Sequence, residues 1–231
     1  MTLAQLSLMY WKYKSKKSIE QYVRQSKVRK IQIGAGNSQT EDWLMTDVDR
    51  RKNWSTVYLD ACQPFPIPGG CFDYVFSEHM IEHIPYSGAL KMLQECHRIL
   101  KPGGTIRIAT PDLDVLLALK RAPANSLQAE YISWIAQYHM PYAAPATATH
   151  VINNAFRSWG HTFLFDEECL DLALRSAGFD RVKRMPVGIS DDLHLRNIEM
   201  HGKTTGNEAM NAFETMVLEA RKPDANYVAN Q

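Results

Sequence analysis

Residues 28–37 read VRKIQIGAGN, and this stretch decides which fold the chain is expected to adopt. Its first part, Val28–Ile33, is typical of a buried strand, and its second part is the turn Gly34-Ala35-Gly36-Asn37. Because glycine has no Cβ, a turn of this kind lets the backbone approach a ligand closely. The stretch therefore predicts a strand that ends in a ligand-binding turn.

Short apolar runs and helical patterns alternate along the rest of the chain, as they do in α/β proteins. Further strands are predicted at Trp43–Val48, Val57–Leu59, Asp73–Phe76, Thr105–Ala109, near Arg181–Val187 and near Phe213–Glu219. Helices are predicted at Met1–Ser26, Gly88–Leu100, Asp112–Arg121, Ser126–Tyr138 and Asp166–Ala177. The pattern predicts one α/β domain with a doubly wound, mostly parallel sheet of about seven strands.

The alternation also suggests how the chain is divided. We expect a basic amphipathic helix over residues 1–27, the α/β domain over residues 28–222 and a tail over residues 223–231. Within the domain, residues 112–161 interrupt the alternation and are too long for an ordinary connection. We expect this stretch to form an inserted, helical lid.

Composition excludes several classes of protein. The 26 Lys and Arg residues nearly balance the 25 Asp and Glu residues, which argues against a general nucleic-acid binder. A hydrophobic fraction of 45% excludes disorder, and no uncharged run is long enough to cross a membrane. The four cysteines have neither zinc-ribbon nor disulfide-framework spacing, so we expect a cytoplasmic protein.

Positive charge nevertheless gathers at the N-terminus, where Glu20 is the only acid in the first 30 residues. The basic residues are Lys12, Lys14, Lys16, Lys17, Arg24, Lys27, Arg29 and Lys30. Two interpretations stay open for this helix: a solvated surface, or peripheral contact with a membrane or another anionic surface.

The glycine turn differs from a dinucleotide-binding fingerprint. That fingerprint requires a third glycine at position 39, where Gln39 stands, and an acid ~20 residues further on. The acid here is Asp47, which comes earlier and ends the second predicted strand, where a carboxylate accepts hydrogen bonds from ribose hydroxyls. The pattern favours an adenosine ligand without a pyrophosphate, and a nicotinamide-dependent oxidoreductase stays as an alternative.

An ordered set of sequence blocks extends from this turn along the chain. The blocks are Gly34–Gly36, Tyr58–Ala61, Pro64–Pro66, Phe72–Ile84, Leu93–Leu100 and Lys101–Gly104, followed later by Trp159–His161, Phe165–Glu168, Ala177–Phe179 and Glu214–Lys222. Taken in this order, they resemble class I S-adenosylmethionine-dependent methyltransferases of the small-molecule type. The resemblance implies a Rossmann-like methyltransferase fold whose last strand runs antiparallel.

The resemblance also implies a role for particular residues around S-adenosyl-L-methionine. Gly34, Ala35, Gly36 and Asn37 would lie against its methionine part, Asp47 or Asp49 would hold the ribose, Asp60 and Ala61 would read the adenine, and Ser77 and Glu78 would line the sulfonium side. The short link 38–42 departs from the family, because it leaves little room for the helix that normally follows the glycine turn.

Residues 79–83 read HMIEH and match the H-x-x-E-H spacing of inverted zinc proteases. A zinc site of that kind needs a third ligand on a following helix. Pro85 ends the segment, and the next helix offers only Glu95. We therefore expect no metal, with Glu82 and His83 bracing the turn.

Candidate acceptor-binding and catalytic residues follow from position. Arg157 is available to pair with an anionic group, and Trp159 is available to stack on a ring. His79, at the carboxyl edge of the sheet, is the first candidate for a general base and His161 the second, although each could instead be structural.

The predicted function is methyl transfer from S-adenosylmethionine to a small or medium-sized acceptor. A resemblance to predicted methyltransferases of bacterial surface-polysaccharide biosynthesis suggests a saccharide or glycolipid hydroxyl. The alternative from another class is a module that binds the cofactor without catalysis.

Overall fold

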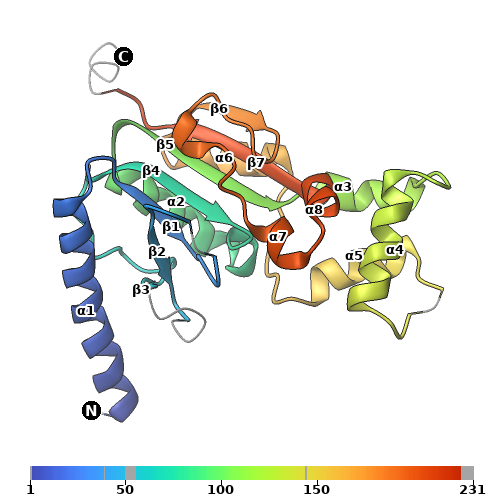
Figure 1. Ribbon diagram of the computed structural model, residues 1–231, viewed down its shortest axis with the longest axis horizontal. Helices are drawn as coiled ribbons and strands as arrows, with labels where there is room; N and C mark the ends of the chain where they lie inside the picture. Colours follow the sequence, from blue (N-terminus) through green and yellow to red (C-terminus); the bar gives the residue numbers. More distant parts are fainter. Residues whose placement is uncertain (1, 39, 50–55, 144, 225–231) are drawn as a thin grey trace.

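A seven-stranded sheet forms the centre of the molecule (Figure 1). The computed structural model describes residues 2–38, 40–49, 56–143 and 145–224. The strands are β1 (Lys30–Ile33), β2 (Leu44–Asp47), β3 (Val57–Tyr58), β4 (Phe72–Glu78), β5 (Leu100–Pro111), β6 (Asp180–Met185) and β7 (Thr215–Arg221). Their order is β3-β2-β1-β4-β5-β7-β6, and only β7 runs antiparallel to its neighbours. The predicted mostly parallel sheet with an antiparallel last strand is confirmed.

Helices flank this sheet and extend it at one end. They are α1 (Leu3–Gln25), α2 (Tyr86–Ile99), α3 (Leu113–Ala118), α4 (Leu127–His139), α5 (Ala148–Arg157), α6 (Glu167–Ser176), α7 (His201–Thr205) and α8 (Glu208–Glu214), with short 3₁₀ turns η1 (Ile81–His83), η2 (Leu119–Arg121) and η3 (Leu193–Leu195). In the described part of the link 38–42 no helix stands between β1 and β2, as its length predicts.

The two faces of the sheet are covered differently. On one face, α1, α2 and α6 contribute Ile19, Leu93 and Leu174 to a buried cluster that includes Ile31 and Phe72 of the sheet. Burying each such side chain contributes about 1.5–3 kcal/mol. On the other face, the segment 186–200 after β6 packs irregular chain against a smaller apolar cluster.

A buried arginine fastens that irregular segment to the sheet. The Arg107 side chain, on β5, is completely buried, and its Nε and Nη1 atoms each lie 2.5 Å from a carboxylate oxygen, of Glu199 and Glu219 respectively. Nη1 also donates to the Ile189 carbonyl oxygen at 2.9 Å. Glu199 and the Ile189 carbonyl, both in the segment 186–200, therefore hold this excursion against β5, while Glu219 pairs with Arg107 from β7.

The stretch predicted as a lid is a helical lobe beyond the carboxyl ends of the strands, at the right of Figure 1. Tyr131, Ile135 and Val151 belong to a separate apolar core in this lobe. The lobe contains one helix that the sequence analysis did not predict, α5, whose first turn is closed by a 3.2 Å bond from the Thr147 amide to His150 Nδ1. The Pro- and Ala-rich segment before α5 has no helical pattern, so the sequence did not indicate where this helix begins.

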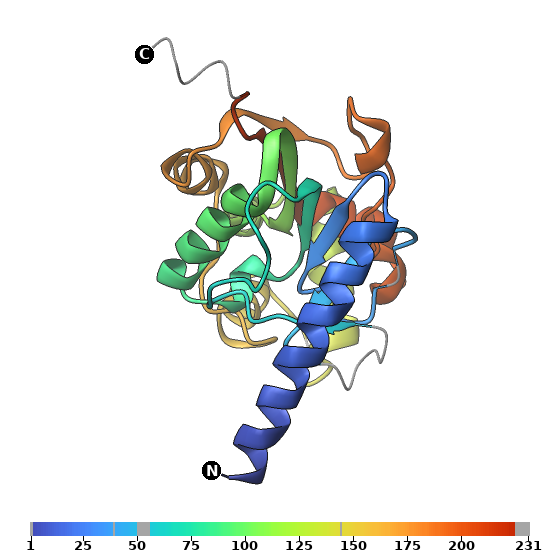
Figure 2. The ribbon, with the colours of Figure 1, turned by 90° about the vertical axis from the view of Figure 1, so that its left-hand side faces the viewer.

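Helix α1 is anchored through its C-terminal half. Tyr22 donates its hydroxyl hydrogen bond to the Lys30 carbonyl at 2.8 Å and stacks on Phe72. Its N-terminal half projects from the body in both Figure 1 and Figure 2. The side chains of Leu6, Met9, Tyr10 and Tyr13 there are 46–59% exposed.

Among the described residues, no helix combines the length and the apolar character that crossing a membrane requires. Residues 225–231 of the predicted tail and Gln39, which replaces the third fingerprint glycine, lie outside the described residues.

Candidate functional site

The glycine turn after β1 has the backbone that the sequence predicts. Gly34 and Gly36 both have positive φ, +69° and +55°, which side chains disfavour. A Cβ on Gly34 would lie 2.0 Å from Met80 Cγ, whereas a Cβ on Gly36 would point into open space. Met80 therefore packs on the turn at Gly34, whereas the space beside Gly36 is open.

Asp47 lies directly against this turn. Its Oδ2 accepts a hydrogen bond from the Gly36 amide at 2.9 Å, and its Oδ1 accepts one from the Asp49 amide at 2.7 Å. At the next strand end, Asp60 Oδ1 accepts from the Cys62 amide at 2.9 Å, and Ala61 is buried. Parallel pairing thus brings the carboxylates that follow β2 and β3 to the edge where β1 ends.

Ser77 and Glu78 end β4. Ser77 is buried, and its Oγ has no hydrogen-bond partner among the described residues. The Glu78 carboxylate accepts from the amides of Met200 and His201 at 2.9–3.0 Å, and burial raises its pKa although these amides oppose the rise. Glu78 therefore holds the start of α7 over the end of β4.

A cavity of about 270 Å³ opens immediately beyond these residues. Its polar lining consists of His79, Glu82, His83, His139, His161, His201, Thr205 and Glu214. Its apolar lining consists of Pro111, Leu116, Trp134, Ile135, Ala155 and Trp159. Among the described residues, no lysine or arginine lines it, and its ionisable lining residues are five histidines and two glutamates.

Contacts at both ring nitrogens hold His79 on the cavity wall. Its φ is +44°, its side chain is 8% exposed, and its Nδ1 lies 3.4 Å from Glu82 Oε1. Nε2 lies 3.1 Å from Thr215 Oγ1 and 3.3 Å from Asn211 Nδ2. Burial lowers the pKa of His79, but the Glu82 carboxylate outweighs this effect and raises it.

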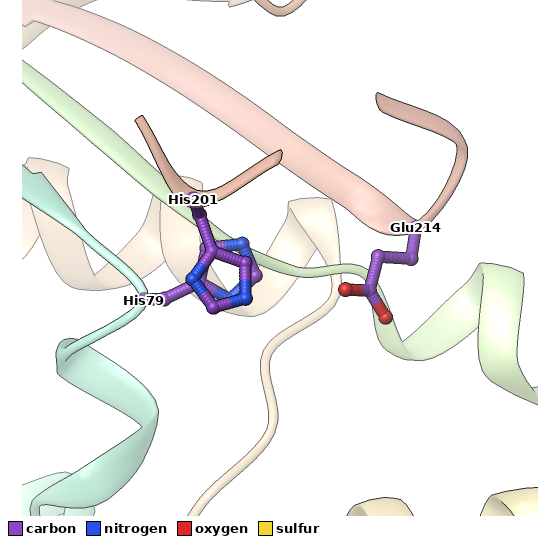
Figure 3. A group of neighbouring side chains, drawn as sticks. All are labelled: His79, His201 and Glu214. Carbon is purple, nitrogen blue, oxygen red and sulfur yellow. The ribbon is translucent and has the colours of Figure 1, made fainter. Parts of the chain in front are cut away.

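The ring of His201 covers that of His79. The two imidazoles stack with centroids 3.8 Å apart and Glu214 beside them, as Figure 3 shows. Burial, and then the neighbouring His79, lowers the pKa of His201 to about 4. Glu214 is buried as well, which raises its pKa, and the Tyr131 hydroxyl donates to its Oε2.

His161 faces the same cavity from the end of the lobe. Its Nδ1 lies 2.8 Å from the Ala155 carbonyl oxygen, so Nδ1 carries the proton and Nε2 keeps its lone pair. Burial lowers the pKa of His161. Its backbone neighbours are tied to η1, because the amides of Thr162 and Phe163 donate to the Glu82 carbonyl oxygen at 2.6 and 3.1 Å.

The structure brings some predicted acceptor-site residues together and leaves one apart. His79, Trp159 and His161 line the cavity. Arg157 is exposed at the end of α5 and is not among the lining residues.

The sequence analysis assigned no place in the site to five ionisable lining residues: Glu82, His83, His139, His201 and Glu214. Glu82 and His83 were expected only to brace the turn, and the H-x-x-E-H spacing was the signal for them. The other two histidines among the five are His139 and His201. Nothing in their local sequence marks them or Glu214, because the fold alone brings them to the cavity.

The sequence-based expectation that no metal binds stays a prediction. It rested on a missing third ligand, which was sought on the following helix. The structure places His161, from the far end of the lobe, beside Glu82 and His83, with ligand atoms of all three within 4.8 Å of one another.

Comparison with known proteins agrees with this geometry. Residues 32–108 match a family model described as a methyltransferase domain. A solved S-adenosylmethionine-dependent methyltransferase from Mesorhizobium loti is 13% identical, covers 92% of this chain and 98% of its own, and has a TM-score of 0.51. A similar enzyme from Archaeoglobus fulgidus is 15% identical, covering 91% of this chain and 94% of its own, with a TM-score of 0.49.

None of the curated proteins compared with the chain matches it. At these identities the solved structures show the fold alone. Residues 32–108 therefore match a methyltransferase domain, and the chain has the fold of a solved S-adenosylmethionine-dependent methyltransferase.

Proposed function

We propose that the protein transfers a methyl group from S-adenosylmethionine to a small acceptor bound in the cavity. The observation that carries this proposal is adjacency: Met80 packs on Gly34 of the glycine turn, and the preceding residue, His79, lines the cavity. In open α/β sheets, ligands bind beyond the carboxyl ends of the strands. The cavity is thus one residue away from the place where a cofactor would lie.

The residues at the strand ends fit this cofactor. The open space beside Gly36 and the unpartnered Ser77 Oγ leave room and a polar contact for its methionine part. Asp47 is assigned to the ribose and Asp60 to the adenine, because they lie at the ends of the next two strands. The Glu78 carboxylate is already occupied by α7, so we assign it to shaping the cavity rather than to the cofactor.

The lining of the cavity indicates an uncharged acceptor. Trp134 and Trp159 offer ring faces, while Glu82 and Glu214 offer carboxylates. Buried carboxylates repel an anion, and Arg157, predicted to pair with one, does not line the cavity. A neutral saccharide-type hydroxyl compound fits this combination, since it stacks on aromatic rings and donates hydrogen bonds to carboxylates.

A hydroxyl must lose its proton as it attacks the methyl group. The cofactor supplies an electrophilic methyl group, so the protein mainly aligns the two reactants and assists proton loss. Of the two predicted histidines, His79 contacts Glu82 through Nδ1 and Thr215 through Nε2, whereas no hydrogen bond from a described residue reaches His161 Nε2. We place His161 next to the reacting hydroxyl and His79 behind it, as a positioning residue.

The test is a search for the product. The purified protein and cofactor labelled in its methyl group are incubated with fractionated cell extract, and mass spectrometry identifies the labelled compound. We expect a small, uncharged compound that has gained one methyl group on oxygen. Label in an anion, a protein or a nucleic acid contradicts the acceptor assignment, and failure to bind S-adenosylhomocysteine contradicts the function.

We also propose that α1 makes peripheral contact with anionic membranes. Exposed Tyr10 and Tyr13 stand on the projecting half of the helix, next to the exposed side chains of Lys12, Lys14 and Lys17. Aromatic rings at the interface and lysines near lipid phosphates are typical of interfacial helices.

A further inference from the structure

The strongest unexplained feature of the cavity is a buried carboxylate oxygen. The Glu82 side chain has no exposed surface, and its Oε2 accepts a hydrogen bond from Thr110 Oγ1 at 3.0 Å. Its Oε1 makes no aligned hydrogen bond with any described residue. The nearest ring nitrogens are His79 Nδ1 at 3.4 Å and His83 Nε2 at 4.0 Å. The ion-pair contact with His79 offsets part of the cost of burying this oxygen, and without an aligned hydrogen bond the oxygen remains available to a further ligand.

We infer that Glu82, His83 and His161 form a binding site for one divalent transition-metal ion. Two imidazoles and one carboxylate are a ligand set that Zn²⁺, Fe²⁺, Co²⁺ and Mn²⁺ accept, with remaining positions open to water or substrate. The inference rests on the proposed function, because it states how the cavity would activate its acceptor.

The surroundings of the three ligands resemble an outer ligand shell. A metal-binding histidine usually donates its second ring N–H to a carbonyl, as His161 does to Ala155, and ligating carboxylates are themselves hydrogen-bonded, as Glu82 is by Thr110. The His161 backbone is held in place by the bonds between residues 162–163 and η1.

The geometry needs only a small adjustment. An ion about 2.1 Å from each ligand in a tetrahedral site separates the ligand atoms by about 3.4 Å. Glu82 Oε1 and His83 Nε2 are 4.0 Å apart, and the His83 side chain is 37% exposed, so its ring is free to approach. The rings of His83 and His161 meet edge to face, at 75°, which lets their lone pairs converge.

A second group, His79, His201 and Glu214, is a poorer site although its ligand atoms are equally close. The lone pairs of an imidazole lie in the ring plane, and the two rings are stacked 16° from parallel, so their lone pairs do not converge on one ion. Glu214 also accepts the Tyr131 hydroxyl.

The ion would act on the acceptor as a Lewis acid. A hydroxyl bound at an open position becomes more acidic, so its proton passes to a water molecule as its oxygen attacks the methyl carbon. The C–S bond of the sulfonium breaks in the same step, with the electron pair going to sulfur. In this scheme His161 Nε2 binds the ion and no longer accepts the proton itself.

The test measures the ion directly. The full chain is stripped with a chelator, dialysed and titrated with Co²⁺, whose visible spectrum reports nitrogen and oxygen coordination, and bound Zn²⁺ is counted by elemental analysis. We expect about one ion per chain, and at least tenfold weaker binding in His83→Ala and His161→Ala. His83 is partly exposed, so His83→Ala is the variant whose folding is safest.

The matched control is His139→Ala, which removes a histidine from the same cavity but outside the ligand set. It should retain the ion. No ion on the wild type in excess Zn²⁺, or equal binding in all three variants, overturns the inference. Calorimetry with S-adenosylhomocysteine separates the two proposals: cofactor binding without an ion overturns the metal site alone, and ion binding without the cofactor overturns the proposed function.

Discussion

At the scale of single residues, Asp47 joins the glycine turn to the proposed ribose site. In Asp47→Ala, the Gly36 amide loses its acceptor and the ribose hydroxyls lose theirs. We expect the affinity for S-adenosylhomocysteine to fall ten- to hundredfold, about 1.5–3 kcal/mol. Calorimetry measures this loss, and Asp191→Ala, which removes an exposed acid, should bind normally. Equal affinity in the two variants would remove Asp47 from the site.

His161 is the residue whose loss should affect turnover most. Whether its Nε2 binds a proton or an ion, His161→Ala removes the lone pair that assists proton loss. We expect kcat to fall about 10²-fold or more, with S-adenosylhomocysteine affinity unchanged. His194→Ala, at an exposed histidine against Tyr74, is the control. Normal turnover in His161→Ala on the true acceptor would make His161 structural.

At the scale of elements, Arg107 decides whether the excursion after β6 stays on the sheet. In Arg107→Met, two buried carboxylates lose their partner, so we expect the free energy of unfolding to fall by about 3–5 kcal/mol. Urea denaturation measures it. Arg175→Met removes an exposed arginine paired with Asp171 and should cost about 1 kcal/mol or less. A similar decrease in the free energy of unfolding in both variants would show that the buried Arg107 ion pairs stabilise the protein no more than an exposed pair does.

Helix α1 carries the prediction about membranes. Each lysine near an anionic bilayer contributes about 1 kcal/mol, so replacing Lys12, Lys14, Lys16 and Lys17 with Gln should abolish binding that the wild type shows at low salt. Co-sedimentation with phosphatidylglycerol vesicles measures it, with phosphatidylcholine vesicles as the uncharged control. If the wild type stays in the supernatant, or both proteins sediment equally, α1 has no such role.

At the scale of the whole molecule, two separate apolar cores predict two stabilities. The lobe core around Tyr131 is small, and the core under the sheet is much larger. We expect amide hydrogens of α4 to exchange faster than those of β4, since smaller units open at lower free energy. Mass-spectrometric hydrogen exchange, resolved by peptide, tests this. Equal protection would mean that lobe and sheet unfold as one unit.

The sequence predicts the sheet better than the site, and the reason is physical. Strands β2 and β4 each contain buried apolar residues and end in an acid, Asp47 and Glu78, so these two strand ends are recognisable from their own neighbours. The cavity depends on contacts across 100 residues and more, such as His79 with Asn211 and Thr215. No local pattern encodes such contacts, and for this reason His201 and Glu214 were missed while His79 and His161 were selected.

The place of β7 has a consequence for synthesis of the chain. This last strand is not at the border of the sheet but between β5 and β6, which it joins through antiparallel pairing. Until residues 215–221 leave the ribosome, β5 therefore presents a long apolar edge with unpaired backbone groups, a template for aggregation. The turn of Gly34 and Gly36 can form earlier. A nascent chain would therefore fold the proposed cofactor-binding turn before the part of the cavity lining that contains Glu214 is synthesised. The proposed methyl transfer thus requires residues 215–221 to have left the ribosome.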